Sequence, residues 1–151
     1  MQAVLEPIMA SAEEEYIHLL RPHWSDDVLG DQALAFVTAY HGFWTKHAPV
    51  LHMRNNMADR GDERMILHRT TAALTVIGLI AAQMGADPQQ RGTIKAAMAT
   101  SLMTGLERIA TVMSASRLPM LADQPVNPIS YLLRAGGRLF ELGIRDMREN
   151  G

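Results

Sequence analysis

Histidine is the residue type whose chemistry we consider first, because six histidines in 151 residues are enough to hold a metal ion. Ligands on one helix face need a spacing of three or four residues. The histidines are separated by at least five residues: His18, His23, His41, His47, His52 and His68. Only Glu15 and His18 form a Glu-x-x-His pair, and a di-iron helical bundle needs two such pairs. We therefore expect no metal site.

Nucleophilic and phosphate chemistry lack their sequence motifs. The chain has no cysteine, which excludes disulfides, thiolate catalysis and cysteine-based metal centres. It also has no G-x-S-x-G, no glycine-rich phosphate loop and no H-E-x-x-H. The sequence predicts neither an enzyme nor a bound cofactor.

Aromatic and methionine side chains carry a stronger signal for binding. One helix face between residues 31 and 48 presents Phe36, Tyr40, Phe43 and Trp44. Periodicity alone favours core packing for these rings and leaves a ligand pocket open as the alternative. Tyr40 and Trp44 favour the pocket, because a buried hydroxyl or indole N–H needs a partner. Methionine suits such a site because it repacks easily.

The elements that position these residues are predicted to be six helices in one all-α domain spanning residues 1–151. The expected ranges are 3–20, 31–48, 49–58, 62–84, 87–114 and 128–148. Pro49 ends one helix and begins the next, because proline disfavours a helical residue before it. Gly61 and Asp62 supply a stop and a cap, and Asp87-Pro88 and Asn127-Pro128 supply two further starts.

Two consequences follow from the helix at 62–84 and the kink at Pro49. From Ala72 to Ala82 the helix is apolar nearly all round, which predicts a central helix wrapped by others. Its apolar stretch is shorter than the roughly 20 residues that span a bilayer, so we expect no membrane span. The kink can fold residues 49–58 over a largely apolar pocket for a small hydrophobic molecule. The predicted ligand-binding residues are Tyr40, His41, Phe43, Trp44, Met53, Met57, His68, Met98 and Leu102.

The last helix has costly glycines on a broad apolar face. Each glycine inside a helix costs about 0.5–1 kcal/mol relative to alanine, and close approach of another helix would compensate. Gly105 on the preceding helix is a candidate partner, and the face is predicted to form a homodimer contact. A crossing within one subunit, or a flexible terminal helix, is the alternative. The predicted interface residues are Ile109, Met113, Ile129, Leu132, Leu133, Gly136, Leu139, Phe140, Gly143 and Met147.

The charge and composition of the chain limit the partners that it can bind and the compartments that it can occupy. The net charge of −2 and the absence of a long basic run predict no DNA binding by these residues alone. The acidic N-terminal segment does not fit a signal peptide, and the lack of cysteine favours the cytoplasm.

The order of these parts resembles a known family. An aromatic-ended helix, a proline break, a short helix ending in M-A-D-R-G-D-E-R and a long apolar helix are similar to the ligand-binding and dimerisation domain of TetR-family transcription regulators. The resemblance continues through G-A-D-P-Q-Q and the apolar last helix. It implies an effector pocket, and dimerisation of the last two helices as an intersubunit four-helix bundle.

The resemblance also implies DNA binding through an N-terminal helix-turn-helix head, which these residues do not contain. Either the head precedes Met1 in a longer protein, or the chain is a head-less ligand-binding or adaptor relative. A helix-turn-helix encoded upstream of Met1 would distinguish these alternatives.

Overall fold

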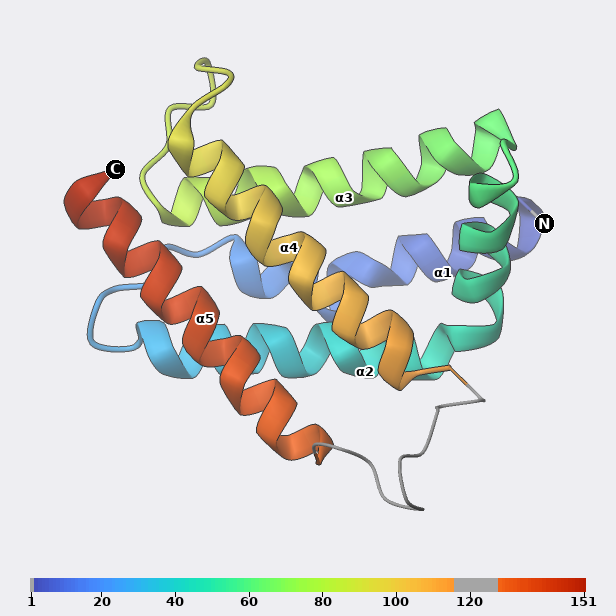
Figure 1. The fold of residues 1–151 in the computed structure, drawn as a ribbon, viewed down its shortest axis with the longest axis horizontal. Helices are drawn as coiled ribbons and strands as arrows, with labels where there is room; N and C mark the ends of the chain where they lie inside the picture. Colours follow the sequence, from blue (N-terminus) through green and yellow to red (C-terminus); the bar gives the residue numbers. More distant parts are fainter. Residues whose placement is uncertain (1, 116–127) are drawn as a thin grey trace.

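A computed structural model describes residues 2–115 and 128–151, and all regular secondary structure within them is helical (Figure 1). The elements are α1 (Gln2–Glu15), a 3-10 helix η1 (Ile17–Leu20), α2 (Leu29–Asp59), α3 (Glu63–Gln83), α4 (Ile94–Met113) and α5 (Ile129–Asn150). The all-α prediction is confirmed. The described chain has five α-helices rather than the six predicted.

The difference in number comes from α2, which is one bent helix. The bend lies at His47 (φ −111°, ψ 16°), two residues before Pro49. Proline has no N–H for the helical ladder and its ring collides with the preceding turn, so the axis changes direction there without ending the helix. The second arm of α2 turns upward at the right of Figure 1 and leads into α3.

The observed helix ends agree with the sequence-based prediction at the Gly61–Asp62 turn and differ from it at Asp87. Gly61 has φ +90°, and the Asp62 side chain accepts hydrogen bonds from the N–H groups of Arg64 and Met65, as the glycine stop and aspartate cap predict. The start predicted at Asp87 is wrong. Gly92 has φ +69°, which interrupts a right-handed helix, and α4 begins after it with a Thr93 cap.

The first predicted helix is also shorter than expected. It ends at Glu15, and residues 17–20 continue as 3-10 helix. Side chains from outside this segment donate hydrogen bonds to its carbonyl oxygens. Trp24 Nε1 donates to Leu19 at 2.8 Å, and Gln83 Nε2 donates to Leu20 at 2.8 Å. Asn127, part of the start predicted for the last helix, lies outside the described residues.

The central helix is α2 rather than α3. The aromatic face of α2 packs in the main core, where Phe36 contacts Phe140 of α5 with ring centroids 5.6 Å apart. In contrast, α3 leaves Leu67 67% exposed and Leu74 60% exposed. The nearly all-apolar stretch from Ala72 to Ala82, which includes Leu74, is therefore not buried on all sides. By length and composition α3 could also cross a membrane, a test that core helices of soluble proteins pass as well.

The α5 helix crosses α2 closely, and its glycines explain how. A Cβ atom on Gly137 would lie 3.0 Å from Leu34 Cα, and one on Gly136 would lie 3.2 Å from Val37 Cγ1. Gly105, the predicted partner, has no such neighbour within 4 Å. The glycines at 136 and 137 thus serve contact with α2 in the same subunit. Figure 1 shows α4 and α5 lying across the same side of α2.

Candidate functional site

A largely apolar groove lies between α1–η1 and α3 and is called here the outer groove. Its volume is about 490 Å³, within the range of about 300–1,000 Å³ typical of small-molecule sites. Its lining residues are Met9, Tyr16, Ile17, Arg64, Leu67, His68, Thr71, Ala72 and Thr75. Apolar side chains form most of its walls. Among these described residues Arg64 is the permanent charge, and no carboxylate lines the groove.

His68 lines this groove and carries a polar atom without a hydrogen-bond partner in the described chain. Its Nδ1 is buried and has no hydrogen-bond partner within the described chain. Desolvation lowers the pKa of His68 from its ordinary value of 6.5, Arg54 lowers this pKa further, and Glu6 opposes the shift. The imidazole is therefore neutral at pH 7 and can donate or accept one hydrogen bond at each nitrogen according to its tautomer.

A second, smaller hollow lies next to the outer groove and is called here the inner hollow. Its volume is about 20 Å³, which is room for about one water molecule. Met9, Tyr16 and Ala72 line both hollows, so these three side chains form the wall between them. Polar side chains also line the inner hollow: Tyr40, Arg54, Arg69 and Glu107.

Burial keeps the tyrosines of the inner hollow protonated. Desolvation raises the pKa of Tyr16 to about 12, and it also raises the pKa of Tyr40 well above the ordinary value. Tyr40 accepts a hydrogen bond from Trp44 Nε1 at 2.9 Å. Its own hydroxyl proton therefore remains available for donation.

The nine predicted ligand-binding residues do not line one cavity. Tyr40, Phe43 and Trp44 are core residues that face the inner hollow, and His68 lines the outer groove. His41 and Leu102 line a third hollow between α4 and α5. The three methionines lie elsewhere: Met53 is exposed, Met57 packs near Leu5 and Met65, and Met98 packs at the edge of the main core.

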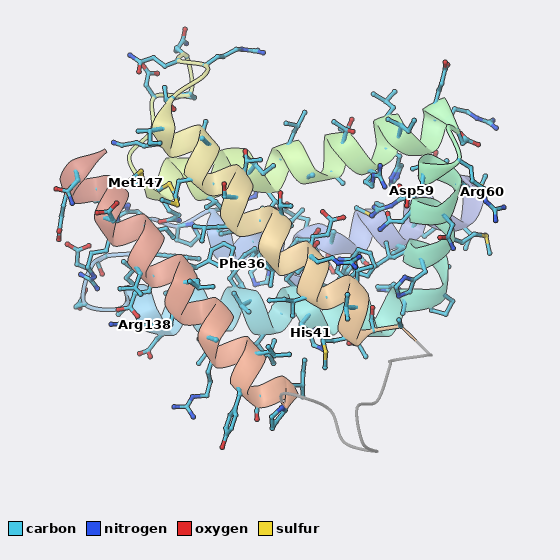
Figure 2. All side chains as sticks on the ribbon, viewed as in Figure 1. Phe36, His41, Asp59, Arg60, Arg138 and Met147 are labelled. Atoms are coloured by element: carbon cyan, nitrogen blue, oxygen red, sulfur yellow. The ribbon has the colours of Figure 1, made fainter. Side chains whose placement is uncertain are left out.

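The third hollow, called here the α4–α5 groove, has a volume of about 110 Å³. Six predicted interface residues line it: Ile109, Leu132, Leu133, Gly136, Leu139 and Phe140. The buried Nδ1 of His41, which lies near the α4–α5 side in Figure 2, has no partner within the described chain.

The remaining predicted interface residues have different surroundings. Ile129 is exposed at the start of α5, and Met113 is half-buried at the end of α4. Met147 is buried in the subunit's own core, and a Cβ atom on Gly143 would lie 3.0 Å from Leu102 Cδ1. These last two residues therefore already have partners within one subunit.

Sequence reasoning missed Arg54 and the α1–η1 wall of the outer groove. A signal for Arg54 was present, because Leu51, Arg54 and Ala58 follow the three-to-four-residue spacing of one helix face and all are buried. No comparable signal marks Met9, Tyr16 and Ile17, because their role depends on which helix lies opposite.

Metal coordination has no candidate in the described part of the chain, where no group of three potential ligands lies together. The arrangement of the outer groove and inner hollow instead suits non-covalent binding. No protein-family model matches this chain, and no curated protein or solved structure matches it significantly.

Proposed function

We propose that this chain is the effector-sensing and dimerisation domain of a TetR-like transcription regulator, and that its effector is a small apolar molecule. One observation carries the binding part of the proposal. The outer groove combines ligand-sized volume, mostly apolar walls and a buried histidine nitrogen without a partner. The bent α2 and the capped turn at Asp62 support the TetR-like part, which rests on the order of helices in the sequence.

Dimerisation would use the outer face of α4 and α5. Several large apolar side chains of α5 remain exposed in the single subunit: Ile129, Tyr131, Leu139 and Leu142. Together with the α4–α5 groove, they form an apolar face that a second copy could cover. Obligate dimers commonly bury about 2,000 Å² or more in such contacts.

Regulation would follow from a shift between two arrangements of the helices. Ligand in the outer groove would contact α1–η1 and α3, and so favour one arrangement over the other. Coupling free energies of about 1–3 kcal/mol are typical of such switches. DNA binding would belong to a helix-turn-helix head preceding residue 1, and the chain alone, with net charge −2, would not bind DNA tightly.

A groove-filling substitution tests the binding site. Thr71 is exposed and lines the outer groove, so Thr71→Trp should occupy the space of the ligand. Ala82→Trp places the same side chain at an exposed position of α3 outside this groove. Apolar compounds that raise the melting temperature of the wild-type protein should fail with Thr71→Trp and succeed with Ala82→Trp. Equal responses of both variants would exclude the outer groove as the site.

The second candidate is a head-less ligand carrier or adaptor, which would use the same groove without regulating DNA. The groove geometry is compatible with both functions. Sequencing the gene upstream of Met1 distinguishes them, because the regulator requires an in-frame helix-turn-helix there.

A further inference from the structure

Arg54 is a buried cation. It lies on the second arm of α2, only 5% of the residue is exposed, and its side chain lines the inner hollow. Its Nε and Nη2 atoms donate to the same acceptor, Asn55 Oδ1, at 3.1 and 3.0 Å. Both hydrogen bonds therefore go to a neutral amide rather than to a carboxylate.

No carboxylate in the described part of the chain lies within ion-pair distance of Arg54. Glu107 lines the same hollow and stabilises the charged guanidinium from farther away, while Arg69 destabilises it. Arg69 has its own carboxylate, Asp59, at 2.8 Å. A buried charge is costly unless a partner lies close to it, and desolvation correspondingly lowers the pKa of Arg54. The inner hollow therefore favours an additional anion beside Arg54.

The donors around this hollow match a carboxylate. Arginine has five N–H donors in a planar fork that fits two carboxylate oxygens, and Asn55 Oδ1 occupies the Nε–Nη2 edge of Arg54. A carboxylate would therefore use the Nη1–Nη2 edge or replace Asn55. The hydroxyl of Tyr40, which already accepts from Trp44, has its proton available, and Tyr16 lines the same hollow. Glu107 is the single carboxylate among the described lining residues of both hollows. An anion that enters from the outer groove passes no carboxylate among the described lining residues of that groove, and it meets the carboxylate of Glu107 only in the inner hollow.

We infer that Arg54 is the anchor for the carboxylate of an amphiphilic ligand, a long-chain carboxylic acid whose apolar chain occupies the outer groove. The inner hollow has room for only about one water molecule, so the head group can enter only when side chains in the wall move aside. Met9 lies in this wall, and its unbranched side chain can rotate to make that room. Along α3 the groove extends from Arg64 to Thr75, about 16 Å at about 1.5 Å per residue, which suits an extended alkyl chain. This inference rests on the proposed apolar-ligand function and names the chemical class of that ligand.

Isothermal titration calorimetry of the whole chain with dodecanoate and with dodecan-1-ol tests the inference. The two probes share an alkyl chain and differ in the charge of the head group. Dodecanoate should bind at least about tenfold more tightly than the alcohol, because hydrogen bonds to charged groups are the strong ones. Arg54→Met should remove that preference while alcohol binding persists, and Arg54→Lys should retain part of it. Arg60→Met, which removes an exposed arginine beyond the end of α2, is the control and should bind like wild type.

The possible outcomes distinguish a failure of the proposed apolar-ligand function from a failure of the proposed role of Arg54. If neither probe binds, the proposed apolar-ligand function fails and the inference fails with it. If the alcohol binds as tightly as the acid, or if Arg54→Met keeps the preference, the groove binds apolar ligands and Arg54 is not the anchor. Circular dichroism and thermal unfolding establish that each variant is folded. If Arg54→Met does not fold, the acid-to-alcohol ratio of the wild-type protein and its change in Arg54→Lys decide the question.

Discussion

The indole Nε1 of Trp44 donates a hydrogen bond to the hydroxyl of Tyr40 at 2.9 Å, one turn earlier on α2. Both side chains are buried in the main core, and the hydroxyl oxygen of Tyr40 gives the buried indole N–H of Trp44 the acceptor that it needs. The polar atoms that suggested a ligand pocket therefore have a partner inside the helix. This pair also forms part of the wall of the inner hollow.

Tyr40→Phe should lower the free energy of unfolding by about 1–3 kcal/mol, because it leaves the Trp44 N–H buried without an acceptor. Urea unfolding, followed by circular dichroism, measures the change. In the double variant Tyr40→Phe, Trp44→Phe, the second substitution should cost less than Trp44→Phe does in the wild-type protein. Strictly additive losses would show that the pair is not energetically coupled.

Gly137→Ala should destabilise the fold by about 1–3 kcal/mol, because the new methyl group would lie 3.0 Å from the backbone at Leu34. Gly78→Ala is the matched control, since this α3 glycine has no neighbour within 4 Å of a new Cβ. Helix propensity alone predicts that the control gains about 0.5–1 kcal/mol. Denaturant midpoints of the two variants should therefore move in opposite directions. A stabilised Gly137→Ala would contradict the close crossing of α5 over α2.

Leu139→Arg should convert a dimer into a monomer with an intact fold. Leu139 is 57% exposed and lines the α4–α5 groove, so arginine at this position should disrupt the proposed intersubunit contact without entering the core. Leu74→Arg changes a similarly exposed leucine on α3 and should leave the dimer intact. Sedimentation velocity measures both. Substitutions at Gly136 and Gly143 would test dimerisation less specifically. A side chain at either position would meet Val37 or Leu102 of the same subunit and could disturb its fold.

His68 should make the protein less stable on acidification. Because its folded pKa lies below the ordinary value of 6.5, the unfolded state binds a proton first as the pH falls. Stability that is present above about pH 6.5 is then lost progressively below it. The free energy of unfolding should fall as the pH drops below about 6.5, and less steeply in His68→Gln. An unchanged slope in His68→Gln would show that burial of His68 does not set this pH dependence.

Local signals identified much of the helical framework. The αL glycine at 61 followed by the Asp62 cap, and the proline at 49, act through backbone geometry within a few residues. Such signals predict where a helix begins or bends. The start near Asp87 was misplaced because Asp87 caps a short turn, with Gln89 N–H on its carboxylate at 2.9 Å, and Gly92 then interrupts the helix.

Which face of a helix is covered was harder to predict. Hydrophobic composition described α3 as buried all round, yet Leu67 and Leu74 are exposed because too few helices surround it. The glycines of α5 correctly indicated a close crossing. The partner of Gly136 and Gly137 is α2, whereas Gly143 faces Leu102 of α4, the helix that carries the predicted Gly105. Periodicity reports that a face is apolar and does not report which element lies against it.

The sequence by itself determined the all-α class, the bend near Pro49 and the capped turn at Asp62, because these depend on local backbone chemistry. Only the tertiary structure decided that Tyr40 and Trp44 pair with each other and that Arg54 is buried at the inner hollow. It also decided that α1 and α3 enclose the outer groove. Cavities and buried charges arise between helices distant in sequence, so no single stretch of residues encodes them.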